Sequence, residues 1–229
     1  MSLKVYDELI QGTEEWHAAR RGIVTASVVG KLVTPTLKVA NNDESRGLTA
    51  LLVAERITGW TDPTWTSFDM ERGIECEPIA RDIYSRNFAA ATEVGFMVRE
   101  LQFESQSFAI GFSPDGLVGD DGLIEIKSPR AKTHLRTILA NQVPPQYMAQ
   151  LQCGLLVSGR KWVDFISYSG GMPLWVKRVE PDPDWLHAIT VAAACFELDA
   201  THMVRAYRAA TKDMPPTERV AYGEVELKL

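Results

Sequence analysis

The sequence predicts an α/β protein, with a central mixed β-sheet flanked by helices. The first observation is a pair of apolar runs within residues 108–129 that flank the turn-forming cluster Gly119-Asp120-Asp121-Gly122, which predicts a β-hairpin. A second hairpin is predicted where apolar residues alternate over 162–168 and 174–179. The third observation is the helical spacing of apolar residues in the segments around these hairpins.

Length and composition favour a single domain over residues 1–229. A chain of 229 residues can bury one large core but is short for two domains. Its hydrophobic content of 45% and charged content of 24% are typical of soluble globular proteins. The sequence has no apolar run near the ~20 residues of a membrane helix and no apolar segment of a signal peptide, so we expect a cytoplasmic location.

The charge distribution limits how the chain could bind nucleic acid. A formal net charge of −6 argues against a protein that coats nucleic acid by bulk charge. A local basic track could still bind it, although such a run is also compatible with a solvated loop. The track consists of Lys127, Arg130, Lys132, His134 and Arg136.

The three cysteines are Cys76, Cys153 and Cys195, and they lie far apart in the sequence. They form no Cys-x-x-Cys pair, so neither a disulfide framework nor a structural zinc site is expected. Their number also disfavours an iron–sulfur cluster held by four cysteines. We expect all three to pack in the core.

The N-terminal elements predict an anion pocket. Residues 16–21 have the pattern of a short helix that ends at Gly22, and residues 28–33 predict a second helix with Ser27 as its N-cap. The N–H groups at such a helix start, together with Arg20, would favour a negatively charged group. A plain capped helix with Arg20 on the surface is the alternative that spacing alone favours.

Helices alternate with irregular chain in the first half. Residues 34–46 and 58–68 are polar or irregular, while residues 48–57 carry helical periodicity. A further helix is predicted over 79–84, with Pro78 in its first turn.

The second half combines strands with two longer helices. Residues 94–110 supply strands that lead into the first hairpin, and a basic loop is predicted over 128–145. Residues 146–158 and 184–212 have helical spacing, and residues 213–229 form a tail rich in Pro and Glu.

The first hairpin carries the residues with the clearest chemical signal. Glu125 and Lys127 point to the same face of its second strand, and Asp115 lies in a tight Pro-Asp-Gly turn. A hairpin that brings Asp115 beside Glu125 requires a proton or a cation between the two carboxylates. Hard oxygen ligands at this spacing suit Mg²⁺ or Mn²⁺. A surface hairpin with solvated charges is the alternative, and Glu-x-Lys alone favours it.

Pro114-Asp115 followed by Glu125-Ile126-Lys127 resembles the PD-(D/E)xK nuclease signature. The wider pattern resembles the phage lambda exonuclease and YqaJ-like viral recombinase family. Its matching pieces run from Trp16 to about Gln152, and they include Trp-His-x-x-Arg, Thr-Ala-Ser, Arg-Gly-x-x-x-Glu and Gln-Tyr-Met-Ala-Gln-Leu-Gln.

This resemblance implies a restriction-endonuclease-like nuclease core and a Mg²⁺-dependent double-stranded DNA exonuclease, with Mn²⁺ as a possible substitute. Such an enzyme would digest one strand 5′→3′ from a 5′-phosphorylated end and leave a 3′ single strand for phage-type recombination. It would work as a ring-shaped homotrimer with a single-strand-annealing recombinase, encoded by a bacterial host or a prophage, as part of phage-type recombination.

The resemblance also implies roles for individual residues. Asp115, Glu125 and the backbone carbonyl of Ile126 would hold the metal, and Lys127 would orient or deprotonate the attacking water. The helix glutamate of the family matches Glu77, with Glu75 as an adjacent decoy. The glutamine that reaches the active site matches Gln150.

For the terminal 5′-phosphate, the resemblance implies Arg20, Ser27 and Ser113. The family's further basic contact falls at Thr133, so Arg130 or Lys132 would have to replace it.

Two other functions remain possible from the sequence. A PD-(D/E)xK endonuclease would cut circular DNA, and the implied 5′-phosphate pocket argues against it. A catalytically inactive DNA-binding relative is disfavoured because Asp115, Glu125 and Lys127 occur together.

Overall fold

The computed structural model describes residues 2–62 and 67–219. The first half of the chain contains β1 (Leu3–Tyr6), α1 (Glu14–Arg20), β2 (Val24–Thr25), the 3₁₀ helix η1 (Val29–Lys31), α2 (Asp43–Thr58), α3 (Phe68–Asn87), β3 (Ala91–Thr92), β4 (Phe96–Phe103) and β5 (Gln106–Phe112). The second half contains β6 (Gly116–Val118), β7 (Gly122–Lys127), α4 (Ala131–Ala140), the 3₁₀ helix η2 (Pro145–Tyr147), α5 (Met148–Ser158), β8 (Trp162–Ser167), β9 (Trp175–Val179) and α6 (Pro183–Ala210).

The strands form two mixed sheets, which confirms the predicted α/β class. The four-stranded sheet has the order β1-β4-β5-β2, and the five-stranded sheet has the order β3-β6-β7-β8-β9. Each sheet contains one parallel pair, β2 with β5 and β7 with β8, while the other pairs are antiparallel. The chain contributes β3 to the five-stranded sheet, forms β4 and β5 in the four-stranded sheet, and returns to the five-stranded sheet at β6. Pro114 lies between β5 and β6, and proline has no N–H with which to extend a ladder.

The predicted first hairpin is confirmed as β6 and β7. Its register pairs Gly116 with Ile124 and Val118 with Gly122. Residues on β7 alternate between two environments, as the period of a strand requires. Ile124 and Ile126 pack in a cluster with residues of α3, whereas Leu123 belongs to the main core. Glu125 shares the face of Leu123, so its carboxylate is directed toward the main core side.

Helix α5 connects the two sheets. It packs against β4 and β5 of one sheet and β8 of the other, and most of its residues are buried. Close approach is possible because Gly154 has no side chain: a Cβ there would lie 2.8 Å from the Phe112 ring. The predicted end of this helix at Gly159 is confirmed, with φ +74° at that residue.

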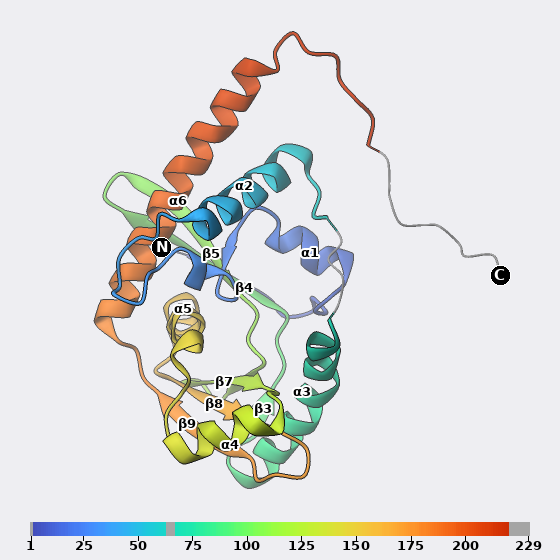
Figure 1. The fold of residues 1–229 in the computed structure, drawn as a ribbon, viewed down its shortest axis with the longest axis vertical. Coiled ribbons are helices and arrows are strands. Elements are labelled where there is room, and N and C mark those ends of the chain that lie inside the picture. The colour runs from blue at the N-terminus through green and yellow to red at the C-terminus, as the bar shows by residue number, and fades with distance from the viewer. Residues whose placement is uncertain (1, 63–66, 220–229) are drawn as a thin grey trace, which may run out of the picture.

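The other helices cover the outer faces. Helix α3 packs on β7, and α6 packs on α2, β4, β5 and α5. The C-terminal turns of α6 project beyond the rest of the fold (Figure 1). Within the described residues, no helix combines the length and the apolar character needed to cross a membrane.

Three predictions about helices were wrong. Residues 28–33 contain only η1, which starts without a side-chain cap, so Ser27 is not an N-cap. Residues 131–140 of the predicted basic loop form α4. Helix α3 begins after Ser67, so Pro78 lies in its interior. Pro78 is exposed there, as is Ile74, whose carbonyl loses its helical donor to the proline ring.

Two predictions extend beyond the described residues. The irregular stretch 58–68 includes residues 63–66, and the tail 213–229 includes residues 220–229.

Candidate active site

A cavity of about 710 Å³ is lined by residues from both halves of the chain. α1 and β2 contribute on one side, α3 on another, and β7 and α5 supply the remaining wall. Its lining includes the predicted site residues Arg20, Ser27, Glu77, Ser113, Asp115, Glu125, Ile126, Lys127, Arg130 and Gln150. The sequence therefore predicted most of the polar groups that the fold brings together here.

Glu125 lies at the centre of the polar contacts in this cavity. Its Oε1 atom accepts hydrogen bonds from Lys127 Nζ and from Gln150 Nε2, each at 2.6 Å. The Glu125 side chain is buried, and its Oε2 atom has no hydrogen-bond partner within the described residues. Such an atom normally has a partner, because an unsatisfied buried oxygen costs free energy. The arrangement leaves one carboxylate oxygen available to a ligand.

Asp115 approaches the same strand from its turn. Its Oδ2 atom accepts a hydrogen bond from the backbone N–H of Ile126 at 2.6 Å. The predicted proximity of Asp115 and Glu125 is reflected in their pKa values. Burial, followed by the charge of Asp115, raises the pKa of Glu125 to about 8. Burial likewise raises the pKa of Asp115.

Lys127 is the cation that offsets these carboxylates. Burial alone would lower its pKa, but the charges of Glu125 and Asp115 outweigh that effect and raise it. The ammonium group therefore stays protonated. It also lies 5.7 Å from the centre of the Tyr147 ring, a cavity-lining residue whose contact the sequence did not predict.

Glu77, on α3, is the third carboxylate at the cavity. The structure distinguishes it from its neighbour, because Glu77 lines the cavity while Glu75 is exposed. Burial, followed by the charge of Asp115, raises the pKa of Glu77 to about 7. Glu77 forms an ion pair with Arg81, one helical turn along. Arg81 Nε also donates to the Asp115 carbonyl at 2.7 Å, so Arg81 joins α3 to the turn that carries Asp115.

The role of Arg81 was not predicted from the sequence. Its i,i+4 spacing from Glu77 was a detectable signal, but its contact with Asp115 depends on long-range packing.

The donor set fits a hard divalent cation. Glu125, which is buried, lies on β7, and the half-buried Asp115 lies in the turn just before β6. Glu125 Oε2 lacks a hydrogen-bond partner among the described residues. Both groups are oxygen donors, which Mg²⁺ and Mn²⁺ prefer. Within residues 2–62 and 67–219, no three His, Cys, Asp or Glu side chains converge as a complete metal set. Glu77, the third carboxylate described above, is engaged by Arg81.

Arg20 organises a second cluster in the same cavity. Its guanidinium donates to the hydroxyl groups of Ser113 at 3.2 Å, Ser27 at 3.3 Å and Thr25 at 3.4 Å. It also stacks on the Trp16 ring, 3.9 Å from the ring centre. Trp16 Nε1 donates to Ser113 at 3.0 Å, which fixes the shared hydroxyl. The structure thus brings Arg20, Ser27 and Ser113 together through side chains, without the predicted helix N-terminus.

The Arg20 guanidinium is partly desolvated. Burial lowers its pKa to about 10, against a smaller opposing effect of Glu55. Its hydrogen bonds within the described part of the chain go to neutral hydroxyl groups. A cation in this setting is stabilised by an incoming anion, because the cost of burial is then offset by a direct charge interaction.

The connection after α1 is held in place by α2. Glu55, a buried carboxylate, accepts a hydrogen bond from the Gly22 N–H at 2.7 Å. Arg56 Nε donates to the Gly22 carbonyl at 2.7 Å and forms a two-pronged ion pair with Glu197 of α6. Gly22 has φ +66°, a conformation that favours glycine. These contacts fix the geometry of the chain between Arg20 and Thr25.

The predicted basic track divides once the fold is known. Arg130 lines the rim of the cavity, as does Thr133, but Lys132 does not. His134 is fully buried and makes hydrogen bonds with Ser167 Oγ and the Pro173 carbonyl, so its inclusion in the track was wrong. The error arose because this segment is a helix with one buried face.

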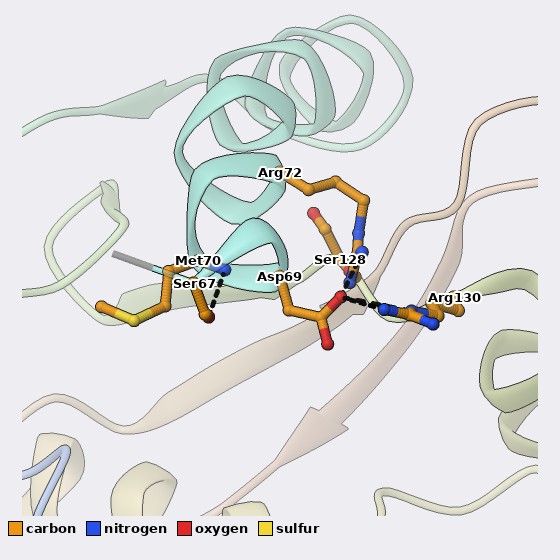
Figure 2. Close-up of polar contacts among 6 residues, drawn as sticks. All are labelled: Ser67, Asp69, Met70, Arg72, Ser128 and Arg130. Carbon is orange, nitrogen blue, oxygen red and sulfur yellow. Dashed lines mark hydrogen bonds and ion pairs between the residues drawn. The ribbon is translucent and has the colours of Figure 1, made fainter. Parts of the chain in front are cut away.

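At the rim, Arg72 and Arg130 both contact Asp69 (Figure 2). Arg72, the arginine of the Arg-Gly-x-x-x-Glu pattern, also lines the cavity, a role that was not predicted from the sequence.

The family described as the YqaJ-like viral recombinase domain matches residues 15–161. A comparison with curated proteins gave no significant match.

Solved structures provide further similarities. An alkaline exonuclease, LHK-Exo, from Laribacter hongkongensis matches with TM-score 0.77 and 33% identity, covering 89% of this chain and all of that chain. The structure of LHK-Exo in complex with dAMP matches with TM-score 0.76 and 34% identity over the same shares. A phage related exonuclease from Haemophilus somnus 129PT has TM-score 0.60 and 11% identity, covering 81% of this chain and 96% of that chain, which is a similarity of fold.

Proposed function

Because this chain belongs to the YqaJ-like viral recombinase domain family, we propose that it is a Mg²⁺-dependent exonuclease of double-stranded DNA. It digests one strand 5′→3′ from a 5′-phosphorylated end and leaves a 3′ single strand for phage-type recombination. The observation that carries the proposal is the presence, in one cavity, of the carboxylate and lysine centre on β7 beside the hydroxyl-lined pocket of Arg20. A similar protein is named an alkaline exonuclease and binds dAMP, a nucleotide of the class that this reaction would release.

In this proposal Asp115, Glu125 and the Ile126 carbonyl hold the cation, which is Mg²⁺ or, as a substitute, Mn²⁺. The unpartnered Glu125 Oε2 atom in the described structure supports this assignment. When bound, the cation supplies Lewis-acid polarisation of the scissile phosphate and lowers the pKa of a water molecule.

The other polar groups orient this centre. Lys127 donates to Glu125 and offsets the negative charge that develops on the phosphate oxygens. Gln150 donates to the same Glu125 oxygen, which leaves Oε2 directed away from both donors. Glu77 completes the acidic wall, and its ion pair with Arg81 fixes its position on α3.

The pocket of Arg20, Ser27 and Ser113 binds the terminal 5′-phosphate. Its support is the partly buried guanidinium, whose hydroxyl neighbours can reorient toward phosphate oxygens. Holding the end of the strand there would fix which phosphodiester lies against Asp115 and Glu125. Arg130 contributes a further backbone contact at the rim.

We also propose that residues 1–229 act as one exonuclease domain and assemble into a ring-shaped homotrimer that works with a single-strand-annealing recombinase in the cytoplasm. A ring suits an acidic protein, because encirclement keeps the protein on DNA without strong bulk attraction.

Incubation with linear and circular duplex DNA tests the proposal. Linear duplex should be degraded in Mg²⁺ and left intact in EDTA, while covalently closed circles should survive. Cutting of circles would favour an endonuclease, and DNA binding without any cleavage would favour an inactive relative.

A further inference from the structure

Three charged side chains converge at the rim of the cavity. Asp69 Oδ1 accepts from Arg72 Nη1 at 2.6 Å and from Nε and Nη2 of Arg130 at 3.2 Å each (Figure 2). Arg72 belongs to α3, whereas Arg130 follows β7. Two guanidinium groups directed at one point repel each other unless an anion lies between them. Asp69 is that anion in this structure.

The two arginines differ in how firmly they are held. Arg72 Nε donates to the carbonyl of Ser128 at 3.1 Å, and its side chain is only 24% exposed. Ser128 directly follows Lys127, so this contact fixes Arg72 relative to the carboxylate centre. The side chains of Arg130 and Asp69 are 71% and 57% exposed. They can move into solvent while Arg72 stays in place.

We propose that Arg72 and Arg130 form a second phosphate subsite for the DNA backbone, which Asp69 occupies until DNA arrives. The inference rests on the proposed function and deepens it. A carboxylate and a phosphodiester each carry one negative charge and present oxygen acceptors to guanidinium groups. Replacing the Asp69 carboxylate with a phosphodiester therefore leaves the charge between the two guanidinium groups unchanged.

The exchange is feasible because the ion pairs are exposed. Surface pairs of this kind contribute little to stability, so displacing Asp69 costs little free energy. Asp69 still competes with every phosphate that enters the subsite. It thereby weakens binding at the rim, and it can return to the arginines as the strand moves on.

Duplex binding tests this competition. Kd is measured with a 5′-phosphorylated duplex in Ca²⁺, over a range of salt concentrations, for the wild type, Asp69→Asn, Arg72→Ala, Arg130→Ala and the Asp69→Asn/Arg130→Ala double variant. Asp82→Asn is the matched control, because Asp82 is an exposed aspartate on the same helix outside the cavity lining.

Asp69→Asn should bind about threefold to tenfold more tightly than Asp82→Asn at low salt, because a competing charge has been removed. Arg72→Ala should weaken binding and reduce the slope of log Kd against log salt by about one. Asp69→Asn should lower Kd less in the Arg130→Ala background than in the wild type, because Asp69 and Arg130 interact directly.

Binding by Asp69→Asn that is no tighter than that of Asp82→Asn would overturn the inference. An equal gain with and without Arg130 would also overturn it, because Asp69 would then act through general charge. A separate measurement, wild-type digestion of linear duplex in Mg²⁺, tests the proposed function. Its failure would remove that function, whereas digestion combined with either binding result above would remove only the role of Asp69.

Discussion

At the scale of single residues, the site depends on opposite charges that stabilise one another: the ammonium group of Lys127 and the carboxylates of Asp115 and Glu125. Lys127 and Gln150 share one oxygen of Glu125, while the other oxygen has no partner among the described residues. The sequence placed Glu125 and Lys127 on one face because strands have a period of two. The contacts of Arg72 with Ser128 and of Arg81 with Asp115 were not predicted, because these partners belong to segments distant in the sequence.

Lys127→Ala should abolish cleavage while the fold persists. Removing a catalytic electrostatic group commonly lowers the rate by about 10²–10³ or more. Digestion of linear duplex in Mg²⁺ measures the loss, and circular dichroism checks the fold. Lys177→Ala is the matched control, because Lys177 is exposed on β9 and does not line the cavity. Wild-type turnover by the Lys127 variant would contradict the assignment.

The raised carboxyl pKa values predict how stability depends on pH without metal. Because the pKa of Glu125 rises to about 8 in the folded protein, the folded state holds a proton that the unfolded state releases near pH 4.5. The free energy of unfolding in EDTA should therefore fall as the pH rises from 4.5 to about 8. Glu125→Gln should flatten the fall, and Mg²⁺ should oppose it by binding the ionised form.

Thermal unfolding across pH 5–9, in EDTA and in Mg²⁺, checks this prediction. The same decline in Tm for Glu125→Gln and the wild type would show that other groups cause it.

At the scale of elements, boundaries were harder to predict than the elements themselves. The hairpin of β6 and β7, the end of α5 at Gly159 and the long α6 all followed from local pattern. Helix α4 was missed because it has no side-chain cap and follows Ser128-Pro129, which reads as a strand end. Pro78 was misplaced because proline normally begins a helix, and its exposure within α3 was not visible from sequence.

The contact between α5 and β5 predicts opposite effects for two helical glycines. Gly154→Ala should destabilise the protein by about 1–3 kcal/mol, because its Cβ would meet the Phe112 ring. Gly47→Ala, in α2, should stabilise by about 0.5–1 kcal/mol, because no atom lies within 4 Å of the added Cβ and alanine favours helix. Urea unfolding of both variants measures the difference, and equal effects would mean that α5 does not require this close approach.

The pocket between α1 and β2 predicts a preference for the DNA end. Arg20→Ala should slow digestion of a 5′-phosphorylated duplex and have less effect on a 5′-hydroxyl duplex, because the lost guanidinium has a phosphate to bind in only one of them. Digestion rates for both proteins on both substrates isolate this coupling. Equal slowing on the two ends would mean that Arg20 serves folding or general DNA binding.

At the scale of the whole molecule, both sheets contribute residues to one cavity. The proposed ring would require further copies of the chain. We expect a homotrimer of about three times 25.5 kDa. Light scattering over a wide concentration range measures the mass, and a monomer throughout would remove the ring. The sequence predicted the fold class because strand and helix patterns are local. It did not predict two separate sheets, since strand order depends on long-range pairing.

The segment from Ser113 to Asp115 joins the two sheets and has a consequence for product length. Ser113 belongs to the pocket of Arg20, and Asp115 to the carboxylate centre, with only Pro114 between them. Two residues span at most about 7 Å, so covalent geometry limits how far the end of a strand can lie from the bond that is cut. Under the proposed function, the length of this segment sets the distance between the bound 5′-phosphate and the bond that is cut, and so sets the product to one nucleotide. Lengthening the segment by two residues, which add at most about 7 Å, should shift the products toward dinucleotides, which chromatography of the digest would resolve.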